Sequence, residues 1–305
     1  MKLKYFEELT YRVPVLLAAW PGMGQVALGA VDYIRRKLNA KPFAEIDLSD
    51  EYLPNEVVVE EGLIKLPRPP ANVFYYKHNP DILIFESTVQ FSGELGANVM
   101  FKIVELSMRF GVKNIFTGAA FPKYGMTSDD PSEIYAVANS KKMRDYIYRK
   151  LRVKIMEEGR ITGMNGLLLA YAMREGIDAA CFLASMPAYA IQFPNPKASR
   201  AIVEVLCELL GFSVDLEEIN YHISIMAKEF AKIEEAFQLS ESQEEPTEKK
   251  PKEVPQSVLK RIEKLFEESR HDKSKAYILK RELDRWNLFE KYEDRFLDLF
   301  KKEKH

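Results

Sequence analysis

The chain has 305 residues, of which 47% are hydrophobic, so it is long enough to bury one large core or two smaller ones. Its 44 basic and 46 acidic residues leave a net charge of −2, which excludes the strongly basic class of proteins that bind nucleic acid or anionic lipid through charge alone. We therefore expect neither nucleic acid nor a membrane among its partners.

The two cysteines, Cys181 and Cys207, lie in apolar runs with no C-x-x-C spacing and no nearby histidine, so we interpret them as buried free thiols. Such sparse cysteine predicts a cytoplasmic protein. The first apolar run, residues 13–20, is too short to cross a membrane, and we expect no signal peptide and no transmembrane helix. No zinc or P-loop spacing is present, so we expect no metal and no cofactor.

The first elements in the chain are a buried strand, a glycine turn, an amphipathic helix and a second strand, over residues 13–47. Residues 22–27 fit the pattern G-x-G-x-x-A, and Asp47 follows about 20 residues later, as in a dinucleotide-binding fingerprint. The turn either binds a nucleotide phosphate or serves close packing between strand and helix. Pro21 removes one N–H donor and Trp20 is bulky, which favours packing.

Strands and helices then alternate up to about residue 237, which predicts a mostly parallel sheet with helices on both faces. The runs at 13–20 and 82–85 are almost wholly apolar and should be central strands. Residues 56–66 indicate a hairpin that turns at Glu61 and Gly62 on the edge of the sheet. The predicted strands are 13–20, 42–48, 56–66, 72–77, 82–86, 114–121, 134–138 and 179–185, and the predicted helices are 25–38, 94–110, 140–151, 166–174 and 197–210.

Two later segments contain residues that a ligand site would use. Asn165 precedes a helix, where it either caps the helix or orients a ligand, and we favour the cap. Ser185 closes a buried strand, but no G-x-S-x-G pattern and no suitably placed histidine accompany it. The candidate loop for a ligand or anion consists of Pro21, Gly22, Met23, Gly24, Asn165 and Gly166.

The last part of the chain predicts a long helix at 215–237, a charged linker at 240–256 that is rich in Pro, Glu and Lys, and an amphipathic helical extension at 257–305. Both helical parts carry an apolar stripe, and the extension is too short to bury its stripe alone. We expect surplus apolar surface and hence a homo-oligomer. The candidate interface residues are Ile219, Ile223, Met226, Phe230, Trp286, Phe289 and Phe296.

Three motifs occur together and in order: W-P-G-M-G at 20–24, G-M-N-G-L-L at 163–168, and L-A-S-M-P-A-Y at 183–189 followed by P-N-P-K-A-S at 194–199. As a set, over about residues 10–238, they resemble the proteasome assembly chaperone 2 family in its archaeal and bacterial branch. The resemblance implies a three-layer α/β/α sandwich of the phosphorylase/hydrolase-like type. The ending F-K-K-E-K-H departs from the hydrophobic residue and Tyr near the end of some relatives, which dock in a proteasome ring.

The resemblance also implies a non-catalytic assembly factor that self-associates and binds protein subunits, such as those of a proteasome. We therefore expect an α/β core domain at 1–239, followed by the linker and the helical extension, and no catalytic residues. The alternative is a nucleotide- or phosphate-ester-binding enzyme that uses the turn from Gly22 to Gly24.

Overall fold

The computed structural model describes residues 1–8, 10, 12–243 and 256–271, and the single residues 279, 282, 283, 286, 288, 291, 292 and 295. The chain divides into two compact units, Met1–Phe237 and Gln238–His305.

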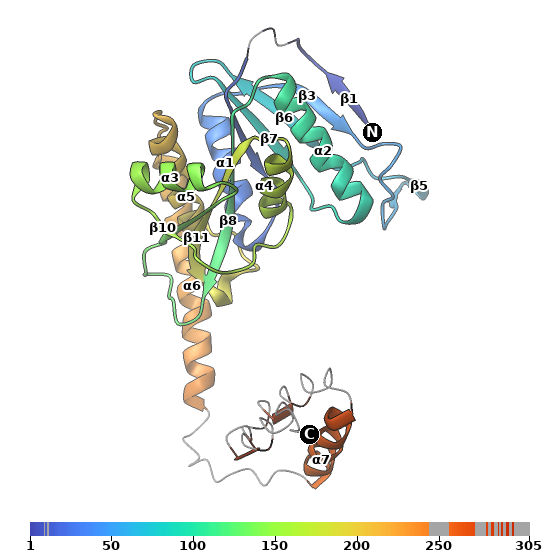
Figure 1. Cartoon of the computed structure of the whole chain (residues 1–305), viewed down its shortest axis with the longest axis vertical. Helices are drawn as coiled ribbons and strands as arrows, with labels where there is room; N and C mark the ends of the chain where they lie inside the picture. Colours follow the sequence, from blue (N-terminus) through green and yellow to red (C-terminus); the bar gives the residue numbers. More distant parts are fainter. Residues whose placement is uncertain are drawn as a thin grey trace, which may run out of the picture. The chain divides into compact units, whose positions relative to one another are not determined.

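The first unit is built on a sheet that has nine strands within the described residues, in the order β1-β3-β6-β7-β2-β8-β11-β9-β10 (Figure 1). Two short strands, β1 and β10, complete its edges, and neither is predicted by the sequence pattern. The strands are β1 (Lys2–Tyr5), β2 (Val15–Ala19), β3 (Lys41–Asp47), β6 (Asn72–Lys77), β7 (Ile82–Ser87), β8 (Asn114–Lys123), β9 (Ile134–Ala138), β10 (Lys154–Ile155) and β11 (Asp178–Pro187).

The direction of the strands differs from the expected mostly parallel sheet. The central strands β7, β2, β8 and β11 are parallel to one another. The pairs β1–β3, β3–β6, β6–β7 and β11–β9 are antiparallel. Only residues 78–81 connect β6 to β7, which is too short for the crossover that parallel neighbours need, so this pair must be a hairpin.

Helices cover both faces of the sheet, which confirms the predicted three-layer α/β/α architecture (Figure 1). Alternate residues of β2 point to opposite faces, since Leu16 and Ala18 join one apolar cluster and Leu17 and Ala19 join the other. The helices α2 (Gly93–Arg109) and α4 (Met164–Arg174) cover the first face. The second face is covered by α1 (Val26–Lys37), α3 (Lys141–Leu151), α5 (Pro196–Leu210) and the first part of α6 (Glu217–Gln243).

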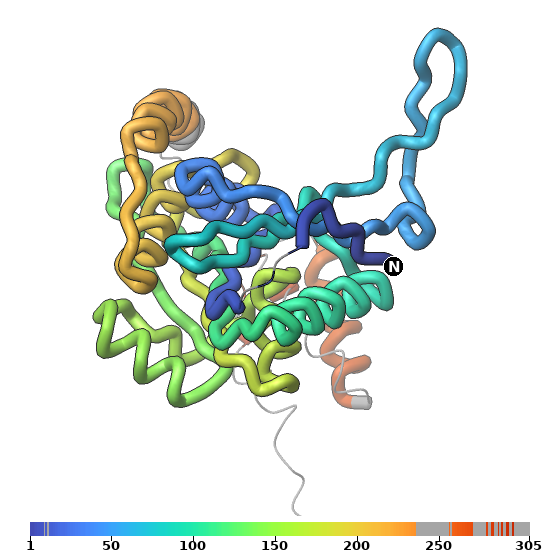
Figure 2. Tube along the Cα trace, turned by 90° about the horizontal axis from the view of Figure 1, so that it is seen from above, coloured from blue at the N-terminus to red at the C-terminus, as the bar shows by residue number. Residues whose placement is uncertain are grey.

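The predicted edge hairpin forms, but it does not belong to the main sheet. Strands β4 (Val58–Glu60) and β5 (Leu63–Lys65) pair only with each other, around a turn at Glu61 and Gly62. The open side of β3 is occupied by β1 instead. Figure 2 shows the hairpin extending away from the rest of the unit.

The second unit begins with the end of α6, which continues past the predicted end at residue 237 to Gln243, and contains α7 (Gln256–His271). Residues 244–255 of the predicted linker lie outside the described residues. The extension has an apolar cluster of its own, which includes Leu279 and Leu283 of the expected stripe, whereas Trp286 is half-buried. The cluster consists of Ile262, Leu265, Phe266, Leu279 and Leu283.

Candidate functional site

The glycine turn after β2 is held by contacts within the chain. Gly24 has a φ of +62°, its N–H donates to the carbonyl of Ile191 at 2.8 Å, and its carbonyl accepts from the N–H of Asn195 at 2.8 Å. A Cβ at this position would lie 2.8 Å from the sulfur of Met186. Gly24 is therefore required for close packing, and its N–H is not available to an anion.

The acid of the dinucleotide fingerprint does not approach this turn. Asp47 lies at the end of β3, and strands β6 and β7 separate β3 from β2. Its carboxylate pairs with Lys4 at 2.7 Å and accepts from Ser49, and these contacts hold its pKa well below the ordinary range. The sequence has the spacing of the fingerprint, but the structure does not place Asp47 beside the glycine turn.

Asn165 fixes the start of α4 to the end of β2. Its amide Oδ1 accepts from the backbone N–H of Trp20 at 3.0 Å, and its Nδ2 donates to the carbonyl of Trp20 at 3.2 Å. Asn165 also accepts at its own carbonyl from Thr117 Oγ1 at 2.8 Å. The predicted N-cap role is wrong, because the cap position is Gly163 and Asn165 lies inside the helix. The side chain satisfies buried backbone groups instead.

Gln90, in the loop after β7, is a residue of the site that the sequence reasoning missed. Its Nε2 donates to the carbonyl of Pro21 at 2.5 Å, and its Oε1 accepts from the N–H of Met164 at 2.9 Å. Gln90 thereby ties the first and second motifs together. Its position after a predicted central parallel strand was the available signal, because such strand ends meet at one edge.

These loops border a pocket of about 660 Å³ at the carboxyl ends of the central strands. It contains four of the six candidate loop residues, Pro21, Gly22, Met23 and Asn165. Gly24 borders a second pocket, beside α1 and α6, and Gly166 a third, beside α4. The large pocket is lined mostly by apolar residues, and its charged residues are Glu158 and Arg160.

Ser185, in the third motif, is also used within the chain. Its Oγ accepts from the N–H of Glu133 at 2.8 Å, and its N–H donates to the Glu133 carbonyl at 2.9 Å. The Glu133 carboxylate is bound by Lys123, by Lys154 and by the hydroxyl of Tyr135, which lowers its pKa to about 2. The carboxylate is thus a fully ionised ion-pair partner and not a proton donor at neutral pH.

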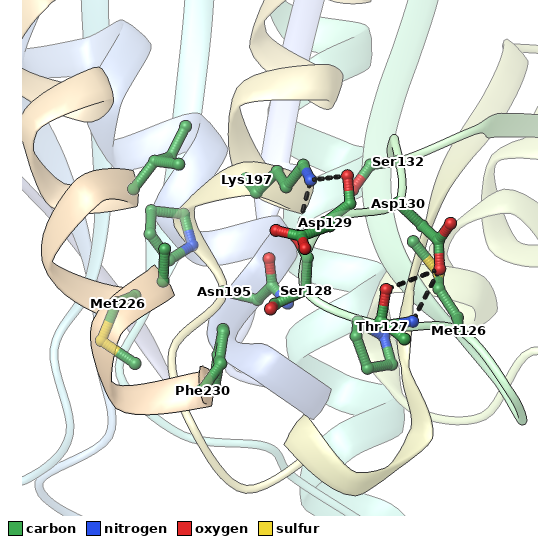
Figure 3. A pocket seen from close by; sticks show the side chains of 14 residues that line it. Met126, Thr127, Ser128, Asp129, Asp130, Ser132, Asn195, Lys197, Met226 and Phe230 are labelled. Carbon is green, nitrogen blue, oxygen red and sulfur yellow. Dashed lines mark hydrogen bonds between the residues drawn. The ribbon is translucent and has the colours of Figure 1, made fainter. Parts of the chain in front are cut away.

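The stripe on α6 is covered by its own chain over much of its length. Ile219 and Phe230 are 3% and 4% exposed and belong to the core cluster of the second face. Ile223 and Met226 are half-buried and line a small pocket of about 160 Å³ between α6, the start of α5 and residues 126–132. Figure 3 shows Met226 and Phe230 on one side of this pocket and Lys197 on another.

Polar contacts reinforce this docking of α6. The carboxylate of Glu234 accepts from the N–H of Ser128 at 2.8 Å and from the hydroxyl of Tyr189. Lys197 Nζ donates to the carbonyls of Ser128 and Asp129 at 2.7 and 3.0 Å (Figure 3). The prediction that this stripe is surplus surface is therefore wrong for Ile219 and Phe230, because α6 adds a further helix to the second face.

The remaining candidate interface residues belong to the second unit. Trp286 is half-buried, whereas Phe289 and Phe296 lie outside the described residues.

Both cysteines are free, and burial raises the pKa of Cys181 to about 12 and that of Cys207 to about 11. Within the described part of the chain, no three His, Cys, Asp or Glu side chains lie together as metal ligands would. None of the helices described there is both long and apolar enough to cross a membrane.

A group of exposed apolar side chains lies on the β4–β5 hairpin and its flanks. The exposed side chains there include Leu63 at 67% and Ile64 at 72%, although these residue types are usually buried. The exposed apolar residues of this segment are Leu53, Val57, Val58, Val59, Leu63, Ile64 and Leu66.

Comparison with known proteins agrees with this fold. Uncharacterized protein MJ1210 of Methanocaldococcus jannaschii is 23% identical over 221 residues, which cover 72% of this chain and 82% of the relative. PbaB of Pyrococcus furiosus, an archaeal proteasome activator, has a TM-score of 0.65 at 22% identity and covers 76% of this chain and 98% of its own. PbaA of the same organism, an archaeal homolog of proteasome-assembly chaperone, has a TM-score of 0.61 at 21% identity and covers 79% and 95%.

These structural likenesses show a shared fold. The model of the PAC2 family matches residues 16–234, which is most of the first unit and more than half of the chain. The resemblance noted from the three motifs is confirmed, and the chain belongs to the PAC2 family.

Proposed function

We propose that this protein is a non-catalytic assembly factor that self-associates and binds protein subunits, in the assembly or activation of a proteasome. The observation that supports the proposal most is the β4–β5 hairpin with its flanks, whose seven exposed apolar side chains suit a protein surface as partner. The solved relatives PbaB and PbaA are a proteasome activator and a homolog of proteasome-assembly chaperone, which supports the proteasome as the setting. The two free thiols support a cytoplasmic location.

The polar side chains in and around the three motifs support a non-catalytic role. Asn165, Ser185 and Gln90 each bond to backbone groups of neighbouring loops. A catalytic group needs a free donor or acceptor that faces the substrate. In this protein these bonds fix the loops at the ends of the strands, as expected of a rigid scaffold that binds a partner.

A second candidate, the binding of a nucleotide or phosphate ester, is favoured only by the pocket of about 660 Å³ at the strand ends. Thermal unfolding in the presence of NAD, ATP, nucleosides or phosphate separates the two functions. A ligand at 100 times its Kd would stabilise the fold by about 2.7 kcal/mol. We expect no shift, and a reproducible shift with one of these ligands would favour the second candidate.

The proposed function is tested directly by mixing the purified chain with proteasome subunits from its own host. We expect the chain to elute as a homo-oligomer in size-exclusion chromatography with light scattering, and to form a larger species with unassembled subunits. A mass near the 35.2 kDa of one chain at micromolar concentration, with no larger species on mixing, would contradict the proposal.

A further inference from the structure

The surface of α2 and α4 has a partly exposed aromatic patch that includes a positively charged guanidinium. The rings of Phe101 on α2 and Tyr171 on α4 meet edge to face with centroids 5.0 Å apart. The guanidinium of Arg174 lies 5.3 Å from the Phe101 ring centre and 5.9 Å from that of Tyr171. Leu167, on the same helix, is half exposed. We call Phe101, Leu167, Tyr171 and Arg174 the α2–α4 patch.

Arg174 is available to a partner. Within the described residues, no carboxylate lies within ion-pair distance of its guanidinium, and its contacts are those with the two rings. An arginine held over aromatic rings keeps its outward N–H groups free to bind a carboxylate. The patch therefore suits a partner segment that is apolar and carries an acid.

The hairpin, residues 57–66, has those two properties, and we call it the hairpin arm. Val59 lies directly opposite Ile64 in the register, so strand alternation puts both on one face together with Val57 and Leu66. All four of these side chains are at least half exposed. The opposite face carries the ion pair between Glu60 and Lys65. The arm thus has one wholly apolar face and one mixed face.

The turn of the arm supplies the acid. Glu61 stands at the tip with a φ of +52°, followed by Gly62 with a φ of +78°, as in the tight turns that join two-stranded hairpins. Among the described residues no cation pairs with the Glu61 carboxylate, whereas Glu60 is paired. An isolated hairpin of this length is at most marginally stable in water, so its apolar face needs a surface to pack on.

We propose that the apolar face of the hairpin arm packs on the α2–α4 patch of a second copy of this chain, with Glu61 paired to Arg174 of that copy. Both halves of this contact, an apolar segment with a free acid and an aromatic patch with a free cation, are present on one chain. Figure 2 shows the arm extending away from the helices of its own unit, where a neighbouring copy can receive it. The inference rests on the proposed self-association and assigns it a surface.

The contact is tested by measuring the dissociation constant of the oligomer by analytical ultracentrifugation over a wide concentration range. We expect the double variant Val59→Ser, Ile64→Ser and the single variant Arg174→Glu each to raise the dissociation constant at least tenfold. Tyr124→Ser is the control, because Tyr124 is 97% exposed and lies outside both surfaces. Circular dichroism and the melting temperature establish that each variant is folded.

A charge exchange tests the pairing of Glu61 with Arg174 specifically. Glu61→Arg should weaken the oligomer, and combining it with Arg174→Glu should restore at least part of the affinity. Failure of the restoration would overturn the pairing of Glu61 with Arg174. Cysteines at positions 64 and 167, introduced as Ile64→Cys and Leu167→Cys, should form a disulfide between copies under mild oxidation, visible as a dimer on non-reducing gels.

The outcomes separate this inference from the proposed function. A wild-type chain that stays monomeric at all concentrations contradicts self-association itself. A stable wild-type oligomer that is unaffected by the arm and patch variants, and that forms no disulfide between positions 64 and 167, overturns the inference and leaves self-association through another surface.

Discussion

The glycine turn after β2 and the hairpin arm differ in what their residues contact. In the turn, the N–H and carbonyl of Gly24 bond within the chain, and the backbone of Trp20 is satisfied by Asn165. In the arm, the strands bond only to each other, and the side chains of Val59 and Ile64 are 64% and 72% exposed. The polar groups of the turn are therefore satisfied within one chain, whereas the arm leaves an apolar face exposed.

From the sequence alone, the glycine turn suggests a binding site more strongly than the arm does, and the structure indicates the opposite. A glycine motif suggests a ligand, because free N–H groups bind anions. A short strand with alternating residues suggests ordinary sheet. A binding segment is distinguished from a structural one by the partners of its hydrogen bonds and by the exposure of its apolar side chains. Buried polar groups are paired, and large exposed apolar patches mark interfaces.

The largest effect is expected from Asn165→Leu, because this change leaves the buried N–H and carbonyl of Trp20 without partners. Each unsatisfied group costs about 1–3 kcal/mol, so we expect a loss of about 4 kcal/mol in the free energy of unfolding. Chemical denaturation measures it, with Asn220→Leu on the exposed side of α6 as the control. A loss no larger than that of the control would mean that the turn does not depend on these bonds.

A somewhat smaller effect is expected from Gly24→Val. A β-branched residue at a φ of +62° is strained, and its Cβ would press on the Met186 sulfur, so we expect a loss of about 3 kcal/mol. Gly22→Ala is the matched control, because Gly22 is extended at a φ of −166° and a Cβ added there would have no neighbouring atom within 4 Å. An unchanged melting temperature for Gly24→Val would refute the packing role of the turn.

Most elements of the fold could be predicted because their hydrophobic period was clear. The strands Asn72–Lys77 and Ile134–Ala138 match their predicted limits. The N-terminal strand Lys2–Tyr5 was missed, since four residues that alternate between lysine and an apolar side chain are too few to establish a period, and its existence depends on pairing with β3. Strand direction was mistaken for a related reason: the period of a strand shows which residues are buried, not which neighbour it pairs with.

The site was predicted less well, because its residues act through contacts that are distant in sequence. Asn165 and Trp20 are 145 positions apart, and no local pattern indicates that one satisfies the other. Gln90 joins two motifs from a third loop. The burial of Ile219 and Phe230 likewise depends on how α6 docks beside α1 and α5, which an apolar stripe alone does not determine.

Glu86 offers a test of intermediate size, because it is an internal polar group that is only partly satisfied. Its Oε2 accepts from Arg35 Nε at 2.8 Å, but its Oε1 is buried without a hydrogen bond in the described structure. Burial raises the pKa of Glu86 to about 7, despite the opposing charge of Arg35. Between about pH 4.5 and pH 7, the folded protein therefore keeps a proton on Glu86 that the unfolded chain, with an ordinary glutamate pKa, has lost.

The sign of the pH dependence follows from that proton. Its contribution to stability is complete below the unfolded pKa of about 4.5 and is lost as the pH rises to about 7, a loss on the order of 3 kcal/mol. Glu86→Gln keeps the hydrogen-bond acceptor and cannot ionise, so its free energy of unfolding should change less between pH 5 and pH 7.5. Glu105→Gln, at an exposed position, is the control. Equal pH dependence in wild type and Glu86→Gln would contradict the raised pKa.

The smallest effect is expected in the arm, and it completes the comparison. Ile64→Ala and Ile84→Ala remove the same atoms, but Ile64 is 72% exposed whereas Ile84 is fully buried in β7. We expect Ile64→Ala to change the free energy of unfolding by less than about 0.5 kcal/mol in dilute, monomeric protein, and Ile84→Ala to lower it by about 3 kcal/mol. At concentrations where the protein self-associates, Ile64→Ala should have a larger effect than in dilute protein. A residue in the contact between copies stabilises the folded state only when that contact forms. The melting temperature of wild type should then rise with concentration and that of Ile64→Ala should rise less. A cost for Ile64→Ala in dilute protein as large as that of Ile84→Ala would mean that the arm packs on its own chain.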